Sequence, residues 1–116
     1  MIVDDDENMR IQMRDILADY GNVRDVASGM DAVRLSREWI PELIFLDVMM
    51  PELDGLATCG MLRANAGLSG VPIVFVTSRR DSQTISQCFR AGGNDFIAKP
   101  LRAWELRLRA QEWLTR

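Results

Sequence analysis

The sequence predicts an α/β fold in which a five-stranded parallel sheet is covered by helices on both faces. Short apolar runs alternate five times with segments of helical periodicity, and this alternation favours parallel strands joined by right-handed crossovers. Residues 43–46 and 73–76 are apolar without interruption, as expected for strands buried on both faces. The 116 residues fit a single domain, 1–116, without a linker, repeat or low-complexity tract.

The first part of the chain contains two strand–helix units. An apolar run at residues 1–3 is followed by a helix over 7–20, in which apolar side chains recur on one side at helical spacing. Residues 23–27 form a more polar strand, which is typical of the edge of a sheet. A second helix over residues 29–39 ends before Pro41, which cannot continue it.

Three more units follow. Strands are predicted at residues 43–47, 73–76 and 96–98, and helices at residues 56–64, 82–91 and 102–114. Pro51, Asp54 and Gly55 form the turn before the third helix, and Gly92-Gly93 stops the fourth. Residues 65–70 are expected to form a loop.

The composition excludes several classes of function. The net charge of -3 predicts no binding to nucleic acid, and the lack of histidine excludes histidine-based acid–base and zinc chemistry. Cys59 and Cys88 form no metal or redox spacing, which fits a reducing cytoplasm. No signal peptide is present and no apolar run approaches the ~20 residues needed to cross a membrane, so we expect a cytoplasmic protein.

Four of the apolar strands end in residues that can ligate or react. Asp4 and Asp5 follow the first strand, Asp47 ends the third, Thr77 ends the fourth and Lys99 follows the fifth. Lys99 is also the only lysine in a chain whose other basic residues are arginine. Parallel sheets bind ligands beyond the carboxyl ends of their strands, so we expect these side chains to form one site.

Three carboxylates at one site require a cation. At ~4 Å and an effective dielectric constant near 20, each pair costs roughly 4 kcal/mol. A hard divalent cation offsets this repulsion, and ligands that are all oxygen favour Mg²⁺ over zinc. Lys99 adds a compact positive charge. Cations, a hydroxyl and a protruding carboxylate favour phosphoryl transfer to an aspartate, with Asp47 as the in-line nucleophile.

These residues together resemble the receiver domains of response regulators in two-component signalling. The resemblance covers essentially the full length and rests on Val3-Asp4-Asp5, Leu46-Asp47-Val48-Met49-Met50-Pro51 with Asp54-Gly55, Val76-Thr77-Ser78, and Lys99-Pro100. Each motif alone is weak, but their order at the strand ends is highly specific. The resemblance implies a flavodoxin-like, three-layer (βα)5 fold with the strand order 2-1-3-4-5 of chemotaxis regulators.

The resemblance also implies a ligand set and a phosphoacceptor. Asp47 would accept the phosphoryl group, and Asp5 would ligate Mg²⁺ directly while Asp4 helps to hold it, often through water. Asp47 and the backbone carbonyl of Met49 would complete the protein ligands, and Mn²⁺ would substitute for Mg²⁺. The phosphoryl donor would be a histidine kinase or a phosphotransfer protein. The chain would assist its own phosphorylation and dephosphorylation without being an enzyme for a free substrate.

The remaining implied roles concern the response to phosphorylation. Thr77 would hydrogen-bond the phosphoryl group, and Lys99 would pair with it. Phe96 matches the aromatic switch residue of the family, which moves inward as Thr77 shifts, although Phe96 has no hydroxyl and its switching is steric only. The bond between Lys99 and Pro100 is commonly cis in this family. Met49 and Arg79 occupy positions that tune dephosphorylation there.

The first strand and its acids depart from the usual pattern. Only three residues precede the acids, against about 5–6 in a usual strand. Three consecutive acids leave the register open. Val3 before them and the spacing to Met9-Arg10 favour Asp4 and Asp5 as the ligating pair, which makes Asp6 a surface charge.

The last helix has a second apolar stripe of undecided role. Leu101, Trp104 and Leu108 lie opposite the side that is expected to pack on the sheet. In one interpretation Trp104 packs on the neighbouring fourth helix. In the other, the stripe is an interface for a homodimer or an output domain, because tryptophan is enriched at interfaces.

Two rival functions stay open. One is a pseudo-receiver that acts as a scaffold without phosphorylation, and the four intact residues Asp5, Asp47, Thr77 and Lys99 speak against it. The other is a phosphohydrolase that also starts from a strand-end aspartate. That class normally has a second acid two residues further on, where this chain has Met49.

Overall fold

Five short parallel strands form the central sheet of the protein in a computed structural model that describes residues 1–115. The strands are β1 (Ile2–Val3), β2 (Asp25–Val26), β3 (Ile44–Asp47), β4 (Ile73–Thr77) and β5 (Asp95–Ala98). Their order is β2-β1-β3-β4-β5, so the predicted flavodoxin-like fold and strand order are confirmed. The order reverses at β1 and β3, which places the carboxyl ends of these two strands at the switch point.

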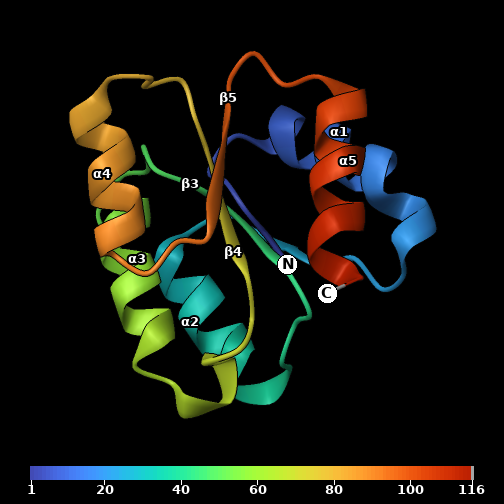
Figure 1. The fold of residues 1–116 in the computed structure, drawn as a ribbon. Coiled ribbons are helices and arrows are strands. Elements are labelled where there is room, and N and C mark those ends of the chain that lie inside the picture. The colour runs from blue at the N-terminus through green and yellow to red at the C-terminus, as the bar shows by residue number, and fades with distance from the viewer. Residues whose placement is uncertain (116) are drawn as a thin grey trace.

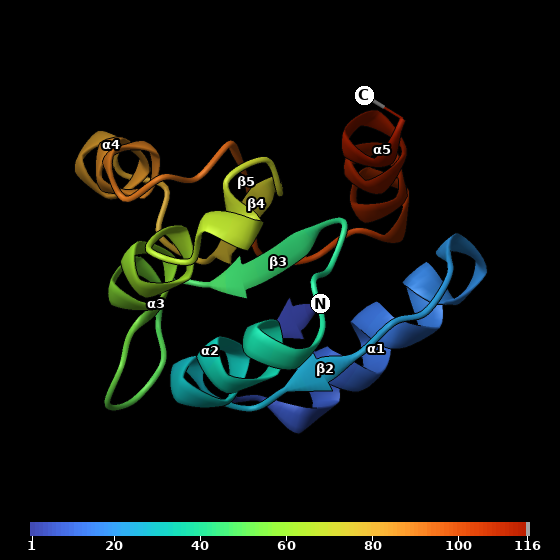
Figure 2. The same cartoon turned by 90° about the horizontal axis from the view of Figure 1, so that it is seen from below.

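Five helices cover the two faces of the sheet. They are α1 (Glu7–Leu17), α2 (Gly29–Glu38), α3 (Gly55–Arg63), α4 (Ser82–Arg90) and α5 (Ala103–Leu114). Figure 1 shows α1 and α5 on one face and α2, α3 and α4 on the other, and the view along the sheet in Figure 2 shows the same three layers. No helix within residues 1–115 is long and apolar enough to cross a membrane.

The strands supply apolar side chains to both faces. In β3, Ile44 and Leu46 belong to the core under α2, α3 and α4, whereas Phe45 belongs to the core under α1 and α5. Residues 73–76 of β4 alternate between the same two cores. This is why β3 and β4 are apolar at every position, since a strand buried on both faces has no solvent-facing side.

Three elements differ from the sequence prediction. The helix predicted over residues 7–20 ends at Leu17, and the chain tightens into a 3₁₀ turn at Ala18–Tyr20. The second strand has two residues instead of five, because only Ile2–Val3 is available to pair with it. The loop predicted at residues 65–70 contains a 3₁₀ turn at Ala66–Leu68.

Candidate functional site

The register of the sheet brings the predicted site residues to one place. Val3 pairs with Leu46, and Asp47 pairs with Val76, so the acids after β1 lie beside the end of β3. Thr77 at the end of β4 pairs with Ala98 of β5, immediately before Lys99. The carboxyl ends of four strands therefore carry one group of side chains.

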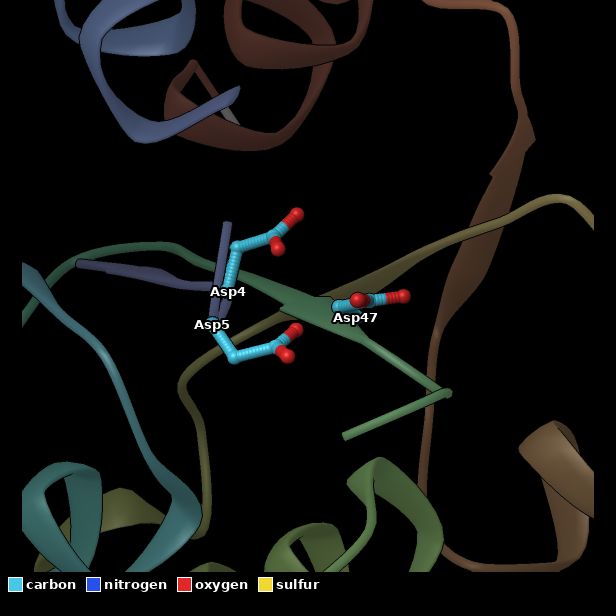
Figure 3. A group of neighbouring side chains, drawn as sticks. All are labelled: Asp4, Asp5 and Asp47. Carbon is cyan, nitrogen blue, oxygen red and sulfur yellow. The ribbon is translucent and has the colours of Figure 1, made fainter. Parts of the chain in front are cut away.

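Three carboxylates converge at this end of the sheet. Asp4, Asp5 and Asp47 each offer an oxygen, and these oxygens all lie within 4.8 Å of one another. Figure 3 shows the carboxylates of Asp4 and Asp5 turned toward Asp47. Asp4 and Asp47 are buried, with 2% and 5% of each residue exposed, whereas Asp5 is exposed. A set of oxygen ligands with one side open to solvent fits a hard cation such as Mg²⁺.

Lys99 lies against two of these acids. Its Nζ is 3.4 Å from Asp4 Oδ2 and 3.6 Å from Asp47 Oδ2. The backbone N–H of Lys99 donates to the carbonyl of Thr77 at 2.8 Å, which ties the turn after β5 to the end of β4. The bond between Lys99 and Pro100 is cis, as the resemblance implies. The single lysine of the chain therefore places its charge at the acid cluster, as predicted.

Burial makes Asp47 an unusual carboxyl group. Desolvation, and then the charge of Asp4, raise its pKa to about 6. The ammonium of Lys99 and the backbone N–H of Met49, which donates to Asp47 Oδ1 at 3.3 Å, act in the opposite direction without cancelling the rise. A bound divalent cation would favour the ionised form of Asp47.

The loop after β3 is packed closely against Asp47. A Cβ on Gly55 would lie 2.0 Å from the carbonyl oxygen of Asp47, so only glycine allows α3 to begin at this point. Asp54 caps α3 through a 2.8 Å hydrogen bond that its Oδ1 accepts from Ala57 N–H. Met49 is 55% exposed at the mouth of the site.

Thr77 and Phe96 are the two residues that the resemblance implies as a switch pair. Thr77 is 1% exposed, and its hydroxyl oxygen accepts a hydrogen bond from the backbone N–H of Arg79 at 3.1 Å. Phe96 is partly buried against the core under α2, α3 and α4. The two residues lie on adjacent strands, β4 and β5.

The apolar stripe of the last helix is only partly as predicted. Trp104 is 60% exposed and Leu108 is 40% exposed, so Trp104 is not covered by α4. Leu101 instead packs in part against the core under α1 and α5. Because Leu101 precedes the first residue of α5, Ala103, the helical spacing used in the prediction does not apply to it.

Three contacts at the site were not predicted. Arg10 donates to the carbonyl oxygen of Asp4 at 2.9 Å, and Arg80 donates to the carbonyl oxygen of Lys99 at 3.0 Å. Asp6 is exposed, as predicted, but it also caps α1, because its Oδ1 accepts a hydrogen bond from Asn8 N–H at 3.0 Å. The cap had a sequence signal, an aspartate directly before a helical run, whereas the arginine contacts depend on how the elements pack.

Comparison with known proteins identifies relatives over the full chain. The family model of the response regulator receiver domain matches residues 1–111. The DNA-binding response regulator MtrA of Mycobacterium tuberculosis is 33% identical over 117 residues, which covers 100% of this chain and 50% of the relative. This chain therefore spans about half the length of the curated DNA-binding relatives that it matches.

Two solved receiver domains have the same architecture. The receiver domain of the sensor histidine kinase PA1611 of Pseudomonas aeruginosa is 30% identical, with a TM-score of 0.90 over 99% of this chain and 95% of that one. That structure has a magnesium ion coordinated in its active-site cleft. The receiver domain of NtrX of Brucella abortus is 30% identical, with a TM-score of 0.88 over 98% of this chain and 96% of that one.

Proposed function

The chain belongs to the response regulator receiver domain family, and on this premise we propose that Asp47 accepts a phosphoryl group from a histidine of a partner protein. The observation that carries the proposal is a buried carboxylate with Lys99 at 3.6 Å and two more acids beside it. Such a group combines a nucleophile with the positive charge that phosphoryl transfer needs.

In the proposed transfer, a carboxylate oxygen of Asp47 attacks the phosphorus atom of a phosphohistidine. A P–O bond forms, the P–N bond breaks, and the imidazole nitrogen that leaves takes up a proton from solvent. Asp47 attacks in its ionised form, and a pKa of about 6 leaves most of it ionised at neutral pH. The exposed side of the cluster, at Asp5 and Met49, gives the donor a path to the carboxylate.

We propose that the acid cluster holds Mg²⁺ through Asp4, Asp5, Asp47 and the backbone carbonyl of Met49. When bound, the ion supplies positive charge that offsets the charge of the acids and of the phosphoryl oxygens. Mn²⁺ also prefers oxygen ligands and substitutes in this proposal. The magnesium ion in the cleft of the related P. aeruginosa receiver domain supports the assignment.

Phosphorylation would change the partners of two neighbouring residues. Lys99 would exchange the carboxylate of Asp47 for a phosphoryl oxygen. The hydroxyl of Thr77, which now accepts from Arg79 N–H, would donate to the phosphoryl group instead. Phe96 lies on the adjacent strand and would move inward as Thr77 shifts, which biases a two-state equilibrium. The output would be read on β5, α4 and α5, with Trp104 and Leu108 of α5 as the exposed apolar contact.

The partners follow from the same chemistry. The donor is a histidine kinase or a phosphotransfer protein. Because the relatives that are named DNA-binding regulators are about twice as long as this chain, control of an output domain is part of the proposal.

The test is phosphorylation by a small-molecule donor. Wild-type protein incubated with acetyl phosphate and Mg²⁺ should give a shifted band on a phosphate-affinity gel, and Asp47→Asn should give none. Asp54→Asn is the matched control, because it makes the same change in the loop that follows β3 and asparagine can still cap α3. Chelation of the metal should remove the shift in the wild type.

The same gel, together with an assay for hydrolysis of a phosphate ester, separates the rival functions. A wild-type band that does not shift would leave the scaffold interpretation ahead. Steady turnover of a phosphate ester would favour a phosphohydrolase, although Met49 occupies the position where that class normally carries its second acid.

A further inference from the structure

Arg10 joins α1 to the loop that carries the acids. Its NH1 donates to the backbone carbonyl oxygen of Asp4 at 2.9 Å, and its Nε donates to Asp25 Oδ2 at 3.0 Å. Only 16% of the Arg10 side chain is exposed, and the same fraction applies to Asp25. The planar guanidinium therefore links the edge strand β2 to the residue that follows β1.

We infer that Arg10 is a positioning residue that fixes the peptide plane between Asp4 and Asp5, and so directs the Asp5 carboxylate into the cation site. The inference rests on the proposed function, in which Asp5 ligates the metal. A peptide unit is planar, so a hydrogen bond to the carbonyl of Asp4 also fixes the N–H and Cα of Asp5.

Asp5 depends on this backbone constraint more than Asp4 does. The carboxylate of Asp4 is buried, accepts a hydrogen bond from Asp6 N–H at 2.9 Å and lies 3.4 Å from Lys99 Nζ. Asp5 is exposed, and the backbone sets the direction of its Cα–Cβ bond and so the region that its carboxylate can reach. Partners of this kind typically contribute 10–100-fold to metal affinity.

Arg14 provides a matched control for Arg10. It lies one turn further along α1 and donates to Asp25 Oδ1 at 2.8 Å, but the hydrogen bond to Asp4 belongs to Arg10. Although burial acts to raise it, the hydrogen bonds and charges of Arg14 and Arg10 hold the pKa of Asp25 below its usual value. Both arginines therefore neutralise the same carboxylate, and only one also holds the acid loop.

The inference and simple electrostatics predict opposite results. Removing one positive charge near the cluster should tighten the binding of a divalent cation, whichever arginine is changed. Loss of the hydrogen bond to Asp4 should weaken binding, and only when Arg10 is changed. The sign of the change in affinity therefore reports positioning rather than charge.

The experiment compares Arg10→Gln with Arg14→Gln by calorimetric titration with Mg²⁺. We expect Arg10→Gln to bind Mg²⁺ about 10-fold more weakly than the wild type, and Arg14→Gln to bind within about twofold of it or more tightly. The Mg²⁺ affinity of Arg10→Lys should lie between those of the wild type and Arg10→Gln, because a lysine ammonium cannot bind Asp4 and Asp25 with the fork geometry of a guanidinium. Equal or tighter binding by Arg10→Gln than by Arg14→Gln would overturn the inference.

A second measurement needs no metal. The ¹⁵N order parameter of the Asp5 amide, which belongs to the peptide plane held by Arg10, should be near the ~0.85 of rigid backbone in the wild type and in Arg14→Gln. It should fall in Arg10→Gln. If Arg10→Gln does not fold, Arg10→Lys takes its place in both measurements.

The two measurements separate this inference from the proposed function. A wild-type protein that binds no Mg²⁺ would contradict the proposed function, and the Asp5 amide alone would then decide the role of Arg10. An Asp5 amide that is equally rigid in the wild type and in the Arg10 variant would overturn the inference, whatever the metal does.

Discussion

The two ends of the central sheet each bury a group that would be charged in water. At the carboxyl end this group is the carboxylate of Asp47, and at the amino end it is the ammonium of Met1, which donates to the carbonyl oxygen of Leu43 at 2.7 Å. Burial raises the pKa of Asp47 to about 6 and lowers the pKa of the Met1 ammonium to about 5. One cause, desolvation, thus pushes both groups toward their neutral forms.

The two buried groups differ in the residues that surround them. Asp47 lies among two further carboxylates and the ammonium of Lys99, so in the proposed function a cation or a phosphoryl group would change its charge state. Met1 borders a cavity of about 210 Å³ that is lined mostly by apolar residues, among them Leu17 and Leu114. Burial alone therefore suppresses charge, and a reactive site also needs charges of both signs to converge.

Removing the ammonium of Lys99 should leave Asp47 without a positive neighbour, so that burial acts on it as it does on Met1 at the amino end. This substitution has the largest effect that we expect in the comparison. Lys99 acts to lower the pKa of Asp47, so in Lys99→Gln this pKa should rise above about 6. Phosphorylation by acetyl phosphate should slow by about 100-fold, since a donor aimed at developing charge is lost. The rate of appearance of the shifted gel band measures the effect.

Lys99→Arg is the matched control for this prediction. It keeps the positive charge but replaces a compact ammonium by a planar fork, so we expect an intermediate rate. A Lys99→Gln protein that is phosphorylated at the wild-type rate would show that the ammonium of Lys99 contributes nothing to the reactivity of Asp47.

The second prediction concerns competition between protons and metal at Asp47. Because its pKa is about 6, the carboxyl group is mostly protonated at pH 5 and mostly ionised at pH 7. In the proposed metal site Mg²⁺ would have to displace that proton, so its apparent affinity should fall about 10-fold between pH 7 and pH 5. Calorimetric titration at several pH values measures this change.

Asp47→Asn supplies the comparison, since its amide does not titrate. This variant should bind Mg²⁺ more weakly at neutral pH and should lack the loss of affinity centred near pH 6. An unchanged pH profile in the variant would assign the proton to another group of the cluster.

The predictability of the fold also differs between elements. Residues 43–47 and 73–76 predicted β3 and β4 to within one residue, because strands buried on both faces must be apolar throughout. The length of β2 was wrong because it is limited by its partner, β1, and not by its own residues. The strand order was predicted from the family resemblance, and the structure confirms it.

The candidate site was predictable where each residue stands at a strand end. Convergence of Asp4, Asp5, Asp47 and Lys99 follows from parallel strands ending on one side, and the distances confirm it. Their roles in phosphorylation stay predictions. The contact of Arg10 could not be predicted, because it joins elements whose separation is set by packing and not by local sequence.

The third prediction uses both ends of the sheet at once. Between about pH 4 and 6 the folded chain holds a proton on Asp47 that the unfolded chain has lost, so the free energy of unfolding should decrease as pH rises. Between about pH 5 and 8 the unfolded chain holds a proton on the Met1 amine that the folded chain has lost, so the free energy of unfolding should increase. Without metal, stability should have a minimum between about pH 5 and 6.

On each side of this minimum, the free energy of unfolding should change by on the order of 1 kcal/mol. Urea titrations across this pH range measure it. Asp47→Asn should lose only the decrease in stability at the acidic end of this range. A chain with two extra residues ahead of Met1 should lose only the increase in stability at the alkaline end, because its ammonium no longer lies beside Leu43. A flat profile in the wild type would contradict the burial of both charges.

The smallest expected effect is the relief of backbone strain at Glu52, and backbone strain also differs between the two ends. Glu52, in the loop that leaves the carboxyl end of β3, has a φ of 64°, and Gly21 and Gly92 occupy the other two positive-φ positions within residues 1–115. A side chain at such a φ costs about 1 kcal/mol, and glycine relieves it at some entropic expense. Glu52→Gly should therefore raise the free energy of unfolding by roughly 0.5 kcal/mol.

Gly92→Ala tests the opposite change, the addition of a side chain at a positive φ, in the turn between α4 and β5. Its φ is 112°, and a Cβ there would lie 2.8 Å from Cγ of Arg63, so steric contact adds to the backbone strain. We expect this substitution to lower the free energy of unfolding by more than about 1 kcal/mol in the same urea titrations. If Glu52→Gly instead destabilised the protein, the glutamate side chain would contribute more to the loop beside Asp47 than its conformation costs. The strained conformation would then be a structural part of the loop beside Asp47.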